Sequence, residues 1–185
     1  MTFEEMLLKR ESCRAYDPTR PVTREDLTKI CEAGRLTPSG CNSQPWRFLA
    51  VDEAEARKKL CDALVLESGR TGAPWREDCN AFIVLIEDEA KLMPGVAEYY
   101  GTTQRFAQGD IGMACLNMCY RAMELGLSTC IIGMADQKKL REAFAIPEKH
   151  EIRMVLAVGY PKEDKPARPK ARKPFESVVS FNEWK

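Results

Sequence analysis

The spacing of apolar and polar residues predicts a chain in which helices and strands are interspersed. Apolar residues at helical spacing predict helices over residues 3–10, 23–37, 54–66, 104–125 and 137–144. Runs of β-branched and aromatic residues predict strands over residues 46–51, 81–86, 129–132 and 152–158. Thr23 can cap the second helix, and Pro38 ends it. This order of elements indicates an α+β fold with a mixed sheet.

The C-terminal end of the chain has a different character from the rest. Residues 162–174 are rich in Lys, Arg and Pro, which predicts an extended surface segment. Because a lone chain does not leave a group of large apolar side chains in water, the residues that follow need a partner surface. These apolar residues are Phe175, Val178, Val179, Phe181 and Trp184. We therefore expect one domain over residues 1–185, in which residues 162–185 form a C-terminal arm.

Charge and length exclude several classes of function. The chain carries 28 Lys and Arg against 28 Asp and Glu, so it lacks the basic excess of nucleic-acid and membrane-surface proteins. Its apolar runs are far shorter than the roughly 20 residues that span a bilayer. The mixed charges of residues 1–10 do not resemble a signal peptide, so we expect a cytoplasmic protein.

Cysteine and histidine usage gives little support to metal or triad chemistry. The eight cysteines lie in a chain without an export signal and are expected to be reduced, structural thiols. Cys115 and Cys119 are four apart, but no second pair lies at zinc-ligand spacing. His150, the single histidine, lies among charged residues and is expected to be solvated. The common Gly-rich phosphate loops and the GxSxG motif are absent from the sequence.

Three clusters carry candidate chemistry. In an extended segment Arg10, Ser12 and Arg14 point the same way and could bind a phosphate dianion, although surface arginines near a helix end are common. The loop 38–46 offers amide and hydroxyl groups suited to a heterocycle, or is a plain connecting turn. The segment 125–133 ends in a glycine that lets a flat ring approach the backbone, or is a helix end followed by a buried strand.

These clusters lie within five motifs that together resemble the FMN-dependent nitroreductase family. The motifs, in order, are RESCRAY, PSGCNSQPWRF, LGLSTCIIG, VLAVGYP and RKPFESVVSFNEW. The resemblance covers nearly the whole chain. It implies a nitroreductase-like fold of the α+β class, with a central, mostly antiparallel sheet flanked by helices. It also implies an intertwined homodimer that binds two FMN molecules at the subunit interface, with the C-terminal arm packed on the partner subunit.

The resemblance also implies roles for individual residues. The RxSxR-type segment binds the FMN phosphate, with Glu11 at a variable position, and basic residues before the last motif complete that site. The loop comes from the other subunit, and a strand end lies beside the reactive edge of the flavin. The implied cofactor-binding residues are Arg10, Glu11, Ser12, Arg14, Pro38, Ser39, Gly40, Asn42, Ile131, Ile132, Gly133, Lys170 and Arg172.

We therefore predict an oxidoreductase that takes hydride from NADH or NADPH and passes reducing equivalents to nitroaromatics, quinones or similar flat acceptors. The flavin performs the chemistry, so no catalytic acid or base and no metal is predicted. Two alternatives stay open. One is a non-catalytic flavin-binding or thiol-based redox-sensing module that uses Cys41, Cys115 or Cys119. The other is a Cys–His hydrolase that uses His150.

Overall fold

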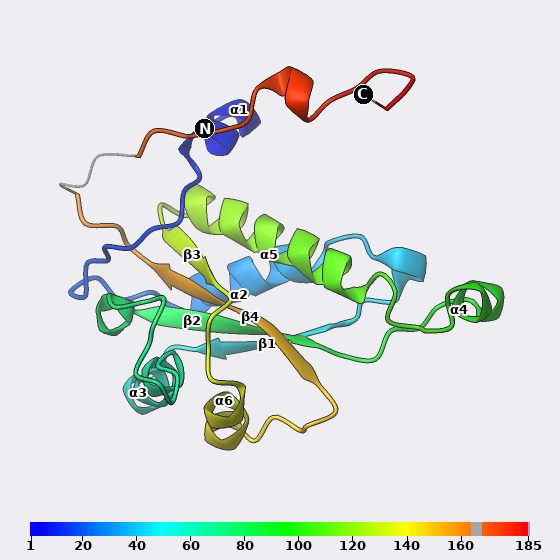
Figure 1. Cartoon of the computed structure of the whole chain (residues 1–185). Coiled ribbons are helices and arrows are strands. Elements are labelled where there is room, and N and C mark those ends of the chain that lie inside the picture. Colours follow the sequence, from blue (N-terminus) through cyan, green and yellow to red (C-terminus); the bar gives the residue numbers. More distant parts are fainter. Residues whose placement is uncertain (164–167, 185) are drawn as a thin grey trace.

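A four-stranded sheet forms the centre of the computed structural model, which describes residues 1–163 and 168–184 (Figure 1). The strand order is β1-β2-β4-β3, and every neighbouring pair is antiparallel. The strands are β1 (Trp46–Val51), β2 (Ala81–Glu87), β3 (Ser128–Ile132) and β4 (Glu151–Gly159). The prediction of a mixed sheet was wrong, because β4 lies between β2 and β3 and runs opposite to both. A parallel pairing occurs at an isolated bridge between Ser12 and Thr129.

The helices confirm the predicted pattern, with one addition. Thr23 caps α2 as expected, since its side chain accepts a hydrogen bond from the backbone N–H of Asp26. Helix α4 was not predicted, because it is a single seven-residue segment with no buried residue and so has no apolar periodicity. The α-helices of the described part are α1 (Phe3–Lys9), α2 (Arg24–Arg35), α3 (Ala54–Ala63), α4 (Pro94–Tyr100), α5 (Ala107–Glu124) and α6 (Gln137–Phe144).

Helices cover both faces of the sheet. Figure 1 shows α2 and α5 on one face, and α3 and α6 on the other. Strand β2 is buried along its whole length, since both of its faces are covered. Helix α5 has eight buried residues, more than any other helix of the described part. The fold is thus a sheet between two helical layers, in which α5 runs along one face.

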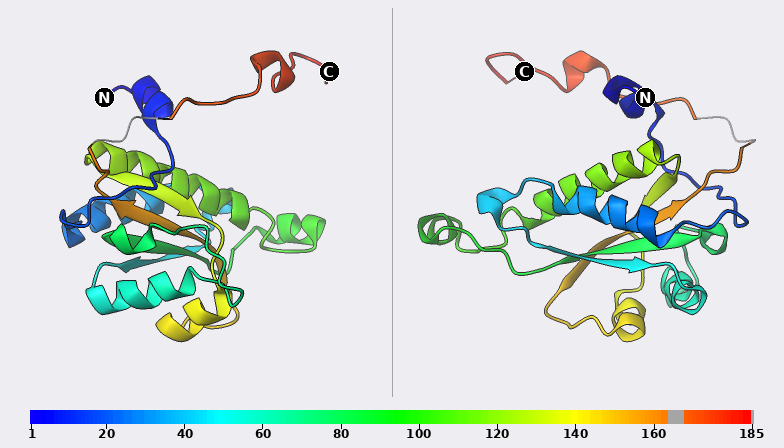
Figure 2. Two further views of the ribbon diagram at one scale, coloured as in Figure 1. Left: turned by 60° about the vertical axis from the view of Figure 1, so that its left-hand side comes forward. Right: turned by 180° about the vertical axis from the view of Figure 1, so that it is seen from behind.

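Residues 88–106 leave the sheet at the end of β2, form α4 away from the two layers, and return to α5 (Figure 2). Gln104 joins the two ends of this excursion. Its side-chain oxygen accepts from the N–H of Ala90 at 2.6 Å, and its amide nitrogen donates to the Glu87 carboxylate and to the carbonyl of Asp88. One side chain therefore fixes where the excursion begins and ends.

His150 is not the solvated residue that the sequence suggested. Its side chain is 11% exposed, and Nδ1 lies 3.2 Å from the carbonyl oxygen of Glu87 and 3.4 Å from Oδ1 of Asp88. The turn before β4, in which the N–H of His150 bonds to the carbonyl of Pro147, folds the ring against the end of β2. The prediction failed because it used only the charged residues next to His150 in the sequence, whereas the ring is covered by residues at the end of β2.

Helix α1 and the described part of the C-terminal arm lie on the same side of the molecule, outside the helical layers. Both views in Figure 2 show the C-terminal arm running past α1 and ending away from the sheet. Helix α1 has no buried residue, so it too adds little to the core. In the part of the chain that the structure describes, no helix is long and apolar enough to cross a bilayer.

Candidate functional site

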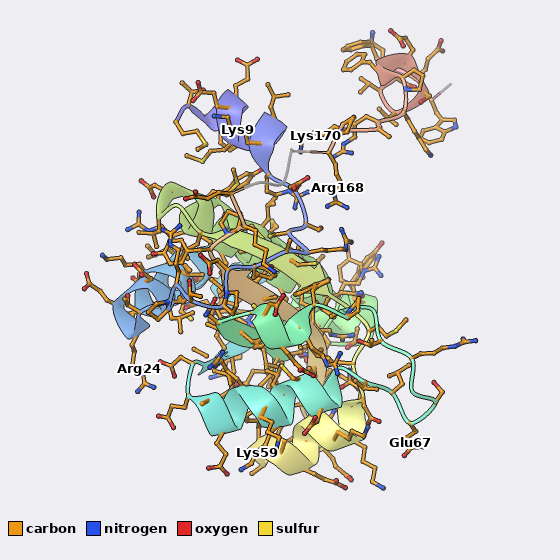
Figure 3. All side chains as sticks on the ribbon, turned by 90° about the vertical axis from the view of Figure 1, so that its left-hand side faces the viewer. Lys9, Arg24, Lys59, Glu67, Arg168 and Lys170 are labelled. Atoms are coloured by element: carbon orange, nitrogen blue, oxygen red, sulfur yellow. The ribbon has the colours of Figure 1, made fainter. Side chains whose placement is uncertain are left out.

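Two segments far apart in the sequence enclose a hollow of about 290 Å³, which we call the basic hollow. One is the N-terminal segment, residues 10–14, and the other is the beginning of the described arm, residues 168–172. In Figure 3, Arg168 and Lys170 lie beside the chain that follows α1. The lining residues are Arg10, Glu11, Ser12, Arg14, Arg168, Pro169, Lys170 and Arg172.

The basic hollow brings together every residue that the sequence assigned to phosphate binding. Lys170 and Arg172 of the arm face Arg10, Ser12 and Arg14 of the N-terminal segment across it. Glu11 also lines the hollow, so simple alternation along an extended segment does not describe the site fully. Sequence reasoning missed Arg168, for which the only available signal was the density of basic residues in segment 162–174.

The N-terminal segment is held in place by a capped helix on one side and by β3 on the other. Thr2 and Glu5 form a capping box at the start of α1, which fixes the helix that precedes the segment. After the helix ends, Ser12 forms a bridge with Thr129 of β3. The N–H of Cys13 donates to the Thr129 carbonyl at 2.9 Å. The sheet edge therefore determines where this segment lies.

Hydrogen bonds from the arm complete the hollow. Lys170 Nζ donates to the carbonyl of Arg10, and Arg168 Nη2 donates to the carbonyl of Ser12 at 2.5 Å. Arg168 also donates from its backbone N and from Nε to Oε2 of Glu11, at 3.2 and 3.4 Å. Arg14 Nη1 donates to the same Ser12 carbonyl at 3.3 Å. Backbone carbonyls thus hold the cationic groups in place around a common space.

The charge in the basic hollow is strongly positive. Five cationic side chains line it, together with the single carboxylate of Glu11. Partial burial lowers the pKa of Lys170, and the nearby charges of Arg10 and Arg172 lower it further. Because like charges at short range repel one another, an anion at this place would be stabilised. The hollow is suited to a dianion such as a phosphate group.

The loop between α2 and β1 has an unusual backbone. Cys41, Asn42 and Gln44 have left-handed φ angles of 53°, 51° and 49°. The Ser39 side chain accepts a hydrogen bond from the N–H of Gln44 at 2.9 Å, and the N–H of Gly40 donates to Oδ2 of Asp110 at 3.1 Å. These bonds give the loop a defined shape that presents Asn42 at the surface. A plain connecting turn would not require this arrangement.

Gly40 allows close packing at this loop. A Cβ atom at that position would lie 2.8 Å from Cδ2 of Phe106, the residue that precedes α5. A side chain at Gly40 would therefore force either the loop or the Phe106 side chain to shift. Pro38, the first of the predicted loop residues, is exposed, whereas Ser39 is half-buried.

The loop and the basic hollow lie at opposite ends of α5 within one chain. Gly40 bonds to Asp110 in the first turn of α5, whereas Ser12 lies against β3, which follows the other end of that helix (Figure 1). Helix α5 has 18 residues, which corresponds to about 27 Å at 1.5 Å per residue. A single chain therefore does not bring the two predicted clusters to one point.

The end of β3 is open on its outer side. Strand β3 is an edge strand, and Ile131 is 42% exposed while Ile132 is buried in the core. A Cβ atom at Gly133 would meet no atom within 4 Å. A flat ligand therefore has room to approach the backbone of residues 131–133.

The thiols divide into one exposed side chain and a largely buried set. Cys41 is exposed on the loop, while Cys115 and Cys119 are almost fully buried in α5. Their side chains are hydrogen-bonded to each other, which together with burial raises the pKa of Cys115. Among the described residues, no group of three or more His, Cys, Asp or Glu side chains is placed to hold a metal ion.

Comparison with known proteins identifies the family to which the chain is related. The family model described as the nitroreductase family matches residues 7–160. A Bacillus subtilis (strain 168) protein, provisionally named NAD(P)H nitroreductase YdgI, is 43% identical over 208 aligned residues, which cover 99% of this chain and 97% of that protein. The major NAD(P)H-flavin oxidoreductase of Aliivibrio fischeri is 26% identical over 210 residues, covering 95% of this chain and 96% of the relative.

Solved structures show the same architecture. A nitroreductase family protein from Clostridium difficile 630 has a TM-score of 0.81 at 27% identity and covers 100% of both chains. An FMN-dependent nitroreductase from Clostridium difficile R20291 has a TM-score of 0.74 at 26% identity, covering 97% of this chain and 98% of that one. Since the family model spans most of the sequence and a relative of nearly the same extent shares 43% of aligned residues, the chain belongs to the nitroreductase family.

Proposed function

We propose that this protein is an FMN-dependent oxidoreductase that takes hydride from NADH or NADPH and passes reducing equivalents to nitroaromatics, quinones or similar flat acceptors. The observation that carries the proposal is the basic hollow, where five cationic side chains surround a single carboxylate. Two relatives support it by name, one as an NAD(P)H-flavin oxidoreductase and one as an FMN-dependent nitroreductase. The names of these relatives do not specify the full range of acceptors, so the acceptor class is part of the proposal.

The residues of the basic hollow fit the phosphate of FMN. A phosphate monoester carries up to two negative charges and three oxygens that accept charge-assisted hydrogen bonds. Arg10 and Arg14 offer guanidinium groups from one side, and Lys170 and Arg172 offer cationic groups from the arm. Ser12 of the N-terminal segment also lines the hollow. We assign these residues to phosphate binding, while the Glu11 carboxylate, which would repel phosphate, acts through a cationic neighbour.

We propose that the flavin ring is bound by residues of both subunits of a homodimer. Ile131 and Ile132 end β3 and Gly133 directly follows it, so these residues lie near Thr129, the β3 residue that bridges to Ser12 of the basic hollow. Loop residues Pro38, Ser39, Gly40 and Asn42 are about one length of α5 away in the same chain. A second copy, with its C-terminal arm on the partner, would supply the loop. The arm includes residues 164–167 and 185, which lie outside the described residues.

The chain itself would bind and orient the reactants. FMN supplies the redox chemistry when it is bound, so no side chain is required as a catalytic acid or base. The backbone of residues 131–133 is open to a flat ring, and a main-chain N–H there can donate to the ring edge and favour its reduced form. Ile131 offers an apolar contact that excludes water from that edge.

The absorbance spectrum of the purified protein tests this function. We expect a yellow protein that is bleached by NADH or NADPH without oxygen and regains its colour when menadione is added. A yellow protein that neither nucleotide bleaches would instead be a non-catalytic flavin-binding module. A colourless protein that also fails to bind added FMN would contradict both readings.

The structure gives less support to the two alternatives. Cys115 and Cys119 are buried, which keeps oxidants away from them and disfavours a thiol sensor built on this pair. The hollow beside His150 is lined by Glu87, Asp88, Glu89, Thr103, Gln104, Lys149 and Glu151, so within the described residues no cysteine lines it with the histidine. A Cys–His hydrolase therefore lacks its nucleophile at that place.

A further inference from the structure

The C-terminal arm is attached to the described body of the protein at the basic hollow. For the residues that the structure describes, every hydrogen bond between segment 168–184 and the rest of the chain ends on Arg10, Glu11 or Ser12. Further along the arm, apolar side chains are exposed, and Figure 2 shows the arm outside the helical layers. The position of the arm in a subunit therefore depends on a few polar contacts with the N-terminal segment.

Electrostatic repulsion opposes this attachment. The arm contributes three cations to the hollow and the N-terminal segment contributes two, against the one carboxylate of Glu11. These groups surround a hollow of about 290 Å³. They therefore lie close enough together that salt screens their mutual repulsion only in part. A dianion placed between the two segments would attract both of them at once. Its binding would therefore favour the attached arm.

Arg168 occupies a special place between the two segments. Its Nε and backbone N both donate to one oxygen of Glu11, and its Nη2 donates to the carbonyl of Ser12. These bonds fix the plane of the guanidinium group. Among the described residues no hydrogen-bond partner is found for Nη1, and Arg168 lines the hollow, so donors remain for a ligand.

We infer that Arg168 is a further phosphate-binding residue and that Glu11 positions it, so that a phosphate group in the basic hollow fastens the C-terminal arm to the N-terminal segment. The inference rests on the proposed function for the identity of FMN as ligand, but it requires only a phosphate dianion. By linkage, the factor by which phosphate favours the attached arm equals the factor by which the attached arm favours phosphate. Glu11 is a positioning residue, because it acts on the ligand through Arg168.

Limited digestion with trypsin measures the attachment of the arm directly. Lys170 is followed by Ala171 and Arg172 by Lys173, so trypsin can cut after both, whereas Pro169 and Pro174 protect the bonds before them. We would use the full-length protein, freed of bound nucleotide, with and without inorganic phosphate. We expect phosphate to slow the release of the arm several-fold, and FMN to do so more than riboflavin, which has no phosphate.

The variant Arg168→Gln should bind inorganic phosphate on the order of tenfold more weakly, since it loses one charge-assisted contact. Its arm should be cut at nearly the same rate with and without phosphate. Arg24→Gln is the matched control, because Arg24 is also an exposed arginine paired with a carboxylate from another part of the chain, that of Asp52. The control should behave like the unaltered protein.

The role of Glu11 is tested by two variants. One oxygen of Glu11 accepts both bonds from Arg168, so Glu11→Gln can keep them while removing a negative charge. We expect it to keep arm protection and to bind phosphate at least as tightly, whereas Glu11→Ala should lose protection. If both Glu11 variants bind phosphate more tightly than the unaltered protein, and phosphate protects their arms from trypsin equally well, then Glu11 only repels the ligand. Its positioning role is then refuted.

The outcomes separate this inference from the proposed function. If inorganic phosphate protects the arm but neither FMN nor riboflavin binds, the inference stands and the flavin function fails. If FMN binds but phosphate and FMN leave the cleavage rate of the arm unchanged, the flavin function stands and the inference is overturned. Equal phosphate affinity in Arg168→Gln and Arg24→Gln would overturn it as well.

Discussion

Two variants that each fail to bind flavin should restore one working site when they are combined in a heterodimer. The first is Arg14→Glu, which changes the basic hollow from five cations and one carboxylate to four cations and two carboxylates. Losing one charge-assisted contact costs about 1.5–3 kcal/mol, or roughly 10- to 150-fold in affinity, and the new repulsion adds to it. This variant should be purified nearly free of FMN.

The second variant is Asn42→Asp, which alters the loop at the other end of α5. Asn42 has a φ of 51°, and Asp tolerates the left-handed region almost as well as Asn does. The hydrogen bond from Gln44 Nε2 to Oδ1 of residue 42 can also be kept. The loop should therefore keep its shape while a carboxylate replaces an amide beside the electron-rich ring edge, which weakens flavin binding.

Within one chain the two positions are separated by about 27 Å, the length of α5, so we expect each site to use Arg14 of one subunit and Asn42 of the other. In a heterodimer of the two single variants, one site then contains both faults and the other contains none. Two different affinity tags would isolate this heterodimer. We expect about one FMN per heterodimer, half of the normal loading, with turnover per bound flavin close to that of the unaltered protein.

A heterodimer of the double variant with an unaltered chain is the matched control. If the sites are shared, each of its two sites contains one fault, and it should bind almost no flavin. If each site instead belonged to one chain, the unaltered chain would bind one FMN, and the heterodimer of single variants would bind none. One FMN in the heterodimer that contains the double variant, and none in the heterodimer of single variants, would refute the shared-site model.

Three other variants test the arm, the core and an ion pair. A chain that ends at Pro174 should lose its dimer and its flavin together, and a yellow monomer in sedimentation would contradict this. In Gly159→Ala the new Cβ would lie 2.7 Å from the buried ring of Tyr16, so overpacking should cost about 1–3 kcal/mol in urea unfolding; an unchanged midpoint would argue against this contact. The hydrogen bond from Arg24 lowers the pKa of Asp52 below its ordinary 3.8, so the pair stabilises the fold above that pH and ceases to do so as the pH falls through the lowered pKa. Arg24→Gln should therefore lose less stability than the unaltered protein as the pH falls below about 5, and identical acid profiles would count against the pair.

The sequence determined most of the local structure by itself. Among the described residues, the period of the apolar positions located the strands and every α-helix except α4, because burial of one face or both leaves a pattern in the chain. The sequence also selected Arg10, Ser12 and Arg14 as neighbours, and the structure places all three in the lining of the basic hollow. Helix α4 left no such pattern because none of its residues is buried.

Only the tertiary structure decided which distant segments meet. Glu11 and Arg168 are 157 residues apart and pair because the arm returns past the N-terminal segment, which no local pattern expresses. His150 contacts the end of β2 for the same reason, and the antiparallel sheet follows from the position of β4 between β2 and β3. Such contacts depend on the order of the strands and on chain reversals, because the free energy of pairing is gained only when the whole sheet and its helices have packed.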